Sequence, residues 1–248
     1  MAHDDIFQTK VVEVGKVKTD NAIVVCGFVG STPAGVLAAS YLVENKKLHE
    51  CAHVRSMHIA PVTVFVGGKL RHPFRIYGQS DGKLLVVMSE IPIDSDGLYE
   101  VASSVMDWIE GQSVSELVML EGIPTDQVPS VRKTYGVSNE EGLARLRAHK
   151  IEIADSALVT GMGGAIMSEC LTRKIPAFSL LTPMYTGFPD PETVLALLQS
   201  MNGIYSMGIP LQNLEGQVQK MHEEMNRIMD NYKNIKQQDT GDTSGLYR

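Results

Sequence analysis

The chain has 248 residues, of which 44% are hydrophobic and 21% are charged, and its formal net charge is −7. An acidic chain without a clustered basic run is a poor partner for nucleic acids and anionic membranes, because phosphate binding needs grouped Lys and Arg side chains. No apolar run reaches the roughly eighteen residues of a transmembrane helix, and the acidic N-terminal residues lack the apolar centre of a signal peptide. These features predict a cytoplasmic globular protein.

Three cysteines, Cys26, Cys51 and Cys170, are widely separated, and their odd number argues against a disulfide framework. Cys51, His53 and His58 bring metal-ligand atoms into one short segment, but no second ligand pair accompanies them. Small buried thiols beside strand histidines are the better explanation. The sequence therefore predicts neither a metal site nor a cofactor.

The first recognisable unit is a strand, a turn and a helix. An apolar run at residues 21–26 predicts a buried strand, and a glycine-containing turn at residues 27–35 follows it. Thr32 before Pro33 is a helix-start signal, because a capping hydroxyl precedes a ring whose missing N–H is not needed in the first turn. A helix is therefore expected at residues 33–44.

The segment that follows contains several apolar runs with no helix between them. Strands are predicted at residues 53–59, 62–66, 74–77 and 83–89. Val101, Val105 and Trp108 then recur at helical spacing and predict a helix at residues 98–108. Consecutive strands without an intervening helix indicate that this part of the sheet is antiparallel.

Strands and helices alternate in the second half of the chain. Strands are predicted at residues 117–120, 155–160 and 175–181, and helices that end near residues 149, 173 and 201. The helix-start signals are a capping box at residues 138–141, a glycine turn at residues 161–164 and the pair Asp190-Pro191. This alternation predicts an α/β fold with a mostly parallel central sheet and helices on both faces. We expect residues 1–236 to form a single α/β domain, because no internal repeat or linker interrupts them.

A long helix is predicted at residues 211–236. Its apolar residues recur at alternating steps of three and four, which is the a/d pattern of a heptad repeat. These residues are Leu211, Leu214, Val218, Met221, Met225, Ile228, Tyr232 and Ile235. Two interpretations stay open: the stripe forms a coiled seam between chains, or the helix lies on its own domain. We assign an oligomerisation role to Leu214, Val218, Met221, Met225, Ile228 and Tyr232.

Two glycine turns have the composition of phosphate-binding loops. Backbone N–H groups at residues 27–35 or 161–164 could approach a phosphate at a helix N-terminus. Their spacing, however, matches neither the dinucleotide-binding fingerprint nor the Walker loop. Tight-turn packing is the better explanation for both turns.

Three carboxylates follow predicted strands or lie in a predicted helix. Glu90, Glu121 and Glu169 could converge at the carboxyl edge of the sheet, where folds of this class bind ligands. General acid–base catalysis would need carboxylates with tuned pKa values, which a sequence does not show. No Gly-x-Ser-x-Gly elbow of a serine hydrolase is present. We therefore predict no catalytic residue and keep an enzyme that uses a sheet-edge pocket as the alternative.

The last twelve or so residues differ in composition from the rest of the chain. Residues 237–245 contain no apolar side chain, so residues 237–248 are expected to form a flexible tail. The tail finishes with Leu246, Tyr247 and Arg248, which combine an apolar residue, an aromatic residue and a free carboxylate. This ending resembles the hydrophobic-Tyr-any (HbYX) C-terminus by which activators dock into pockets of the proteasome α-ring.

A series of short motifs runs through the body of the chain. They are Gly27-Phe28-Val29-Gly30, Ala38-Ala39-Ser40-Tyr41-Leu42, Arg75-Ile76-Tyr77, Ser89-Glu90-Ile91-Pro92, Gly163-Gly164-Ala165-Ile166-Met167, Lys174-Ile175-Pro176, and Pro189-Asp190-Pro191 with Leu195. In order and spacing, over about residues 20–235, this set resembles the proteasome assembly chaperone 2 family in its archaeal form. The turn Gly30-Ser31-Thr32-Pro33 departs from the pattern, because many members carry a further glycine there. That departure argues against ligand binding at this turn.

The resemblance implies an α/β sandwich like that of nucleoside phosphorylases, no established catalysis, and homo-oligomers that handle proteasome subunits. Members with an HbYX end resemble assembly factors or ATP-independent activators. We therefore predict a non-enzymatic protein that docks Leu246, Tyr247 and Arg248 into the α-ring of the proteasome core particle. A nucleoside phosphorylase- or hydrolase-like enzyme is the alternative.

Overall fold

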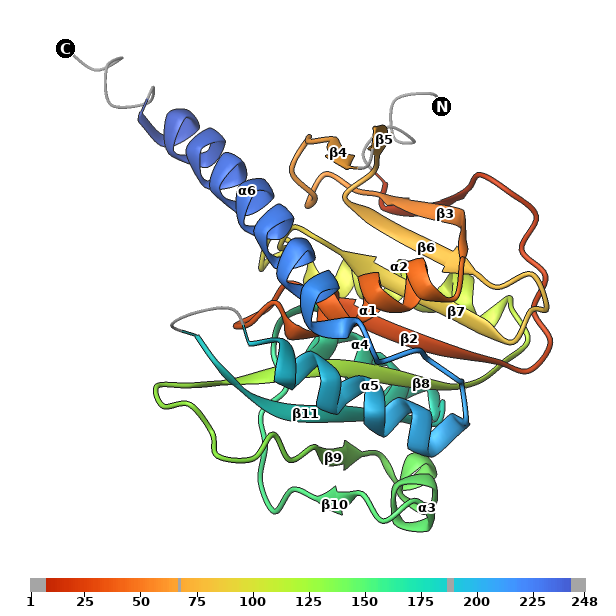
Figure 1. Ribbon diagram of the computed structural model, residues 1–248. Helices are drawn as coiled ribbons and strands as arrows, with labels where there is room; N and C mark the ends of the chain where they lie inside the picture. Colours follow the sequence, from red (N-terminus) through yellow and green to blue (C-terminus); the bar gives the residue numbers. More distant parts are fainter. Residues whose placement is uncertain (1–7, 67, 187–189, 242–248) are drawn as a thin grey trace.

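One extended sheet organises the protein, whose computed structural model describes residues 8–66, 68–186 and 190–241 (Figure 1). The sheet has nine strands in the order β1-β3-β6-β7-β2-β8-β11-β9-β10. These strands are β1 (Lys10–Glu13), β2 (Ala22–Phe28), β3 (His49–Arg55), β6 (Phe74–Gly78), β7 (Leu84–Ser89), β8 (Val114–Thr125), β9 (Tyr135–Ser138), β10 (Glu152–Ile153) and β11 (Ala177–Tyr185). A separate two-stranded hairpin is formed by β4 (Val64–Val66) and β5 (Lys69–Arg71).

The sheet is mixed, so the prediction of a mostly parallel sheet is wrong. Its centre is parallel, since β2 runs in the direction of both β7 and β8, and β8 in that of β11. One flank is antiparallel from β1 through β3 and β6 to β7, and β9 is antiparallel to β11. Connection length is the cause: residues 79–83 join β6 to β7, which is long enough for a hairpin but too short for a crossover.

Helices cover both faces of the sheet, as predicted (Figure 1). They are α1 (Ala34–Asn45), α2 (Leu98–Glu110), α3 (Glu140–Ala148), α4 (Gly161–Arg173), α5 (Pro191–Tyr205) and α6 (Leu214–Gly241). Helices α1, α5 and α6 share one core with Val25 and Val118, whereas α2 and α4 share the other with Val24 and Met119. Successive strand residues point to opposite faces, so strands covered on both faces are continuously apolar.

Two local predictions in the second half differ from the structure. The N-cap of α3 is Asn139, whose side chain accepts a hydrogen bond from the N–H of Gly142 at 3.1 Å, whereas the Ser138 hydroxyl donates to the carbonyl of Ala177 at 3.0 Å. Residues 155–160 belong to no strand of the described chain. They follow the short strand β10 and lead into α4, and Leu158 among them is 87% exposed. Without a neighbouring strand, an apolar run does not form a ladder.

Helix α6 is longer than predicted at its C-terminal end. It begins at Leu214 and extends to Gly241, so residues 237–241, which their composition assigns to a flexible tail, are helical. Lys236, Gln237 and Gln238 are good helix formers and favour continuation of a helix that has already been nucleated, whereas the last three residues of the helix are poorer helix formers. The remainder of the predicted tail, residues 242–248, lies outside the described residues. Neither α6 nor any other described helix has the length and apolar composition required to span a membrane.

Helix α1 lies unusually close to the sheet. A Cβ atom on Gly27 in β2 would overlap the carbonyl oxygen of Gly35 in α1, and a Cβ atom on Gly35 would overlap the carbonyl oxygen of Leu120 in β8. The helix therefore rests directly on the backbone of two strands. The first glycine turn is accordingly a packing requirement, as its spacing indicates.

We predict that Gly35→Ala lowers the free energy of unfolding by about 2–3 kcal/mol, because the added methyl group forces α1 away from β8. The matched control is Gly203→Ala in α5, where no atom lies near the added methyl group. That substitution should raise the free energy of unfolding by about 0.5–1 kcal/mol. Urea denaturation of both variants measures the difference, and equal effects of the two substitutions would contradict the close approach of α1.

Candidate functional site

The first half of α6 buries one face on its own domain. Four apolar side chains of this face are at most 9% exposed and belong to the core under α1 and α5. These residues are Leu214, Val218, Met221 and Met225. In addition, the side chain of Asn45 at the end of α1 donates a hydrogen bond to the Gln217 side chain at 3.2 Å. About three turns of the helix are thereby held against the body.

The connection between α5 and α6 is held by hydrogen bonds to its backbone. The hydroxyl of Tyr41 donates to the carbonyl of Pro210, and the ammonium of Lys46 donates to the carbonyl of Met207 at 2.6 Å. The Asn202 side chain both accepts from the N–H of Ile209 at 2.9 Å and donates to its carbonyl at 3.0 Å. These contacts fix where α6 begins and therefore the direction in which it leaves the sheet.

The apolar stripe of α6 thus packs on its own domain, which was one of the two interpretations of its heptad pattern. Further along the stripe, Ile228 is half-buried and Tyr232 is 9% exposed, and both lie beside the segment that contains β4. Burial within one chain accounts for this pattern without a second chain. The oligomerisation role assigned to these residues therefore stays a prediction.

The C-terminal end of α6 projects beyond the sheet (Figure 1). At about 1.5 Å per residue, its 28 residues give a length of about 42 Å, of which the part held under α1 and α5 is less than half. The predicted docking residues Leu246, Tyr247 and Arg248 lie outside the described residues. The structure therefore describes the helix that precedes them and not their own positions.

The three glutamates proposed for a catalytic set have separate neighbours. Glu90 is buried and forms an ion pair with Arg75, which donates a hydrogen bond to it. Glu169 pairs with Arg173 at 2.7 Å in α4, and the same guanidinium binds two carboxylates of α2. Glu121 contacts neither arginine and lies against two glycine turns. Glu90 thus pairs with an arginine of β6, whereas Glu169 pairs within α4 with an arginine that also binds α2.

Glu121 occupies the space that the glycine turns leave. A Cβ atom on Gly163 at the start of α4 would overlap Oε1 of Glu121, and a Cβ atom on Gly30 would lie 3.9 Å from Oε2. The absence of a side chain at Gly163 therefore accommodates the carboxyl group, which explains the second glycine turn as packing. Burial raises the pKa of Glu121 to about 7. A large fraction of this carboxyl group is accordingly protonated near neutral pH.

A small hollow lies at the carboxyl edge of β2 and β7. Its volume is about 240 Å³, and its polar side chains come from Ser31, Ser89, Ser95 and Thr160. Ligands of α/β proteins often bind at such an edge. The described side chains that line the hollow include none of the three glutamates. The hollow therefore lacks the carboxylate set that acid–base catalysis would require.

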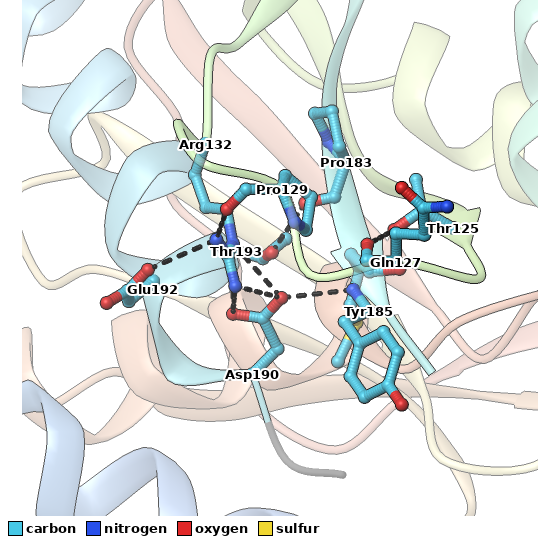
Figure 2. A network of polar contacts seen from close by, with 10 residues as sticks. Thr125, Gln127, Pro129, Arg132, Pro183, Tyr185, Asp190, Glu192 and Thr193 are labelled. Atoms are coloured by element: carbon cyan, nitrogen blue, oxygen red, sulfur yellow. Dashed lines mark hydrogen bonds and ion pairs between the residues drawn. The ribbon is translucent and has the colours of Figure 1, made fainter. Parts of the chain in front are cut away.

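A buried ion pair that the sequence analysis missed orders the neighbouring loops (Figure 2). The Arg132 guanidinium donates to both carboxylate oxygens of Asp190 at 3.2–3.3 Å, and Arg132 also donates to the carbonyl of Pro129. The N–H of Tyr185 donates to Asp190 Oδ2 at 3.0 Å. The pair thus connects the loop after β8 to the end of β11 and the start of α5. The sequence marks Asp190 as a helix cap, but its side chain makes no capping hydrogen bond.

The residues considered as metal ligands have separate partners. The Cys51 thiol donates to the carbonyl of Ile76 at 3.3 Å, the His53 ring stacks on His72 at 3.6 Å, and His58 lies 3.1 Å from Glu100. Across the described part of the chain, no group of three or more His, Cys, Asp or Glu side chains is arranged to hold a metal ion.

We predict that Glu121→Gln stabilises the protein at about pH 8 and has little effect at about pH 4. The folded-state pKa of Glu121 is about 7, above its ordinary value of 4.5, so protonation favours the folded state. Ionisation then costs stability as the pH rises from about 5 to 8, by up to about 3 kcal/mol. The amide has the same shape and does not ionise, so it removes this cost. Urea denaturation at both pH values measures the effect, and a difference that does not change with pH would contradict the assignment.

Comparisons with solved structures agree on the fold. A protein of unknown function from Thermoplasma acidophilum is 44% identical, with a TM-score of 0.84 and coverage of 90% of this chain and 91% of that chain. Pyrococcus furiosus PbaA, described as an archaeal homolog of proteasome-assembly chaperone, is 21% identical, with a TM-score of 0.76 and coverage of 88% and 99%. Pyrococcus furiosus PbaB, described as an archaeal proteasome activator, is 17% identical, with a TM-score of 0.74 and coverage of 90% and 99%.

At these identities, the likeness to PbaA and PbaB shows a shared fold. Family membership rests on the sequence, because the PAC2 family model matches residues 24–229, which is most of the chain. The resemblance inferred from the short motifs is thus confirmed at the level of the family. This chain belongs to the PAC2 family.

Proposed function

We propose that this protein binds the proteasome core particle in the cytoplasm and acts as an assembly chaperone or an ATP-independent activator. Membership of the PAC2 family and the descriptions of the similar PbaA and PbaB structures support a proteasome-related role. The observation that carries the proposed mode of binding is the projection of α6 (Figure 1). A helix that is held at its base and projects beyond the sheet suits a docking role for the residues that follow it.

The docking elements we propose are Leu246, Tyr247 and Arg248. Leu246 fills an apolar pocket of the α-ring, and Tyr247 packs beside it and offers its hydroxyl to a backbone or carboxylate partner. The free carboxylate of Arg248 pairs with a cation of the α-ring, for which a lysine is the natural candidate. The Arg248 side chain contributes less, because the motif accepts any residue there. The proposal requires that Arg248 be the last residue of the mature chain.

The extended helix changes the reach of this tail. The nine residues of α6 after Tyr232 add about 14 Å along the helix axis. The four residues 242–245 then extend at most about 14 Å before Leu246. A partly helical spacer is stiffer than a coil of the same length, so it presents the docking residues over a narrower range of positions.

One docked tail buries little surface, so several tails on a homo-oligomer are part of the proposal. Once one tail is bound, the others bind at a local concentration in the millimolar range, provided that their spacing fits the pockets. Avidity then exceeds the affinity of a single tail by about two to four orders of magnitude. The α-ring repeats its pockets around a ring, which suits a partner with several identical tails.

We predict that Tyr247→Ala lowers the affinity for an archaeal core particle at least about tenfold, because it removes the aromatic anchor and its hydroxyl contact. Surface plasmon resonance with an immobilised core particle measures the effect. The matched control is Arg248→Ala, which keeps the terminal carboxylate and should bind nearly as well as the unmutated protein. If the two variants bind alike, the proposed roles of these residues are wrong.

A second prediction concerns the terminal carboxylate alone. Adding one glycine after Arg248 moves the carboxylate by one residue and leaves every side chain in place, so binding to the core particle should be lost in the same assay. Unchanged binding of the extended chain would show that the tail does not dock through its C-terminus.

The alternative function is a nucleoside phosphorylase- or hydrolase-like enzyme that uses the hollow at the carboxyl edge of β2 and β7. We predict that the purified protein turns over neither ATP nor nucleosides, with or without phosphate. The readout is chromatographic detection of the free base and of ADP. Turnover that is lost in Ser31→Ala or in Thr160→Ala, whose side chains line the hollow, would overturn the non-enzymatic proposal.

A further inference from the structure

The hairpin of β4 and β5 carries an exposed apolar pair. Phe65 and Leu70 are partners across the two strands, and they are 68% and 71% exposed. The neighbouring residue Val64 is buried, so one side of the hairpin is anchored to the body and the other faces solvent. The hairpin is not part of the main sheet. A two-stranded hairpin is marginally stable alone, and an outward apolar pair on it favours a covered state.

A hollow of about 480 Å³ lies directly beside this pair, between β4 and α6. One wall is the segment from Val62 to Phe65, and Ile91 contributes to the floor. The other wall is a single face of α6, since its residues recur at steps of three, one, three and one. They are Glu224, Arg227, Ile228, Asn231 and Tyr232. Figure 1 shows β4 as the strand of the hairpin that lies nearer to α6. Phe65 belongs both to the exposed pair and to the wall of this hollow, so the apolar knob and the hollow share one surface.

The charges around this surface are complementary to one another. The hairpin carries the exposed cation of Lys69, while the hollow is rimmed by the exposed side chains of Glu224 and Arg227. In the described part of the chain, none of these three side chains forms an ion pair. Residues 60–73 contain no carboxylate, although the chain as a whole has a net charge of −7. Lys69 on the hairpin and Glu224 at the hollow are thus available to pair between two copies.

We propose that two copies of this chain associate through this surface, with Phe65 and Leu70 of each copy seated in the hollow between β4 and α6 of the other. A surface that carries both a knob and its hollow satisfies the condition for an isologous, two-fold contact. Lys69 then faces Glu224 of the partner subunit, and the reciprocal contact follows from the symmetry. This inference deepens the proposed function, which includes a homo-oligomer, and it names the contact that holds copies together.

The second copy is favoured over other occupants because the contact leaves the end of α6 free. The heptad stripe of α6 is already used within its own domain, so chains that associate must use another surface. The hollow is lined by the middle of α6, from Glu224 to Tyr232, which comes before its projecting end. Association there places α6 between its own domain and the hairpin of the second copy. The contact does not use the residues that follow Gly241, which the proposed function assigns to docking.

Sedimentation velocity of the full chain over a range of concentrations tests the apolar part of this contact. We expect the unmutated protein to sediment as a dimer or a larger oligomer, and Leu70→Glu and Phe65→Ser each to raise the dissociation constant at least about tenfold. The matched control is Leu158→Glu, because Leu158 is 87% exposed in the loop before α4. It should sediment like the unmutated protein. A monomeric unmutated protein, or an oligomer unaffected by both hairpin substitutions, would overturn the proposal.

A charge exchange tests the orientation of the two copies. Lys69→Glu and Glu224→Lys should each weaken association, because each places like charges opposite one another. The double variant should recover most of the association of the unmutated protein, since it exchanges the two charges. No recovery in the double variant would overturn the predicted pairing. Circular dichroism of each variant verifies that it is folded.

The same variants separate this inference from the proposed function. A monomeric Leu70→Glu variant keeps its C-terminal residues, so it should still bind the core particle, at the lower affinity of a single tail. If Leu70→Glu is monomeric and binds the core particle as tightly as the unmutated protein, the proposed contact between copies is supported and the proposed gain in affinity from several tails is wrong. If Tyr247→Ala keeps its oligomeric state and loses binding, the two surfaces act independently.

Discussion

Burial of one face of α6 against α1 and α5 is the interaction on which the rest of this protein's action depends. An isolated helix of this composition would be marginal in water, and tertiary contacts stabilise most helices in proteins. The four buried residues at its start contribute about 1.5–3 kcal/mol each by burial, which is enough to hold the helix against fraying at its base. The outer turns continue the helix in the direction that its base sets. The position of the proposed docking residues therefore depends on the burial of Leu214 to Met225, which lie more than twenty residues earlier in the chain.

That burial depends in turn on a constraint in the sheet. Helix α1 forms part of the surface on which α6 lies, and it reaches its position only because Gly27 and Gly35 let backbone approach backbone. The glycine turn that resembles a phosphate loop is thus an element of the helix layer. A similar exchange occurs at Gly163, where the missing side chain makes room for Glu121. In both places, glycines that suggest a ligand serve the packing of this chain.

The sequence predicted the elements well and their partners less well. Periodicity identified the buried side chains of α6, such as Val218 and Met221, because helical spacing decides which residues share a face. It did not decide whether that face meets another chain or its own domain, since both arrangements bury the same stripe. The antiparallel pairing of β6 with β7 was predicted correctly, because no helix separates these strands in the sequence. The overall share of antiparallel pairing was underestimated, since an apolar run predicts burial and does not give the direction of its neighbour. The contact between Arg132 and Asp190 has no sequence signature, because the two residues are far apart in the chain. The expectation that Glu90, Glu121 and Glu169 converge at one edge of the sheet failed because the sequence does not show which residues each of them contacts.

The buried charges of the domain stabilise its structure, which is consistent with a protein that binds its partner through the end of α6. Buried carboxylates are joined to arginines that connect elements, as in Glu90 with Arg75 and Asp190 with Arg132, and such pairs are costly to break. The hairpin of β4 and β5 and the outer turns of α6 lie on the same side of the molecule (Figure 1), and the hollow lies between β4 and α6. A contact between copies at the hollow would therefore fix the separation of the two projecting helices. Avidity depends on the match between that separation and the spacing of the pockets on the α-ring. The geometry of self-association would therefore also determine which α-ring the tails can bind together.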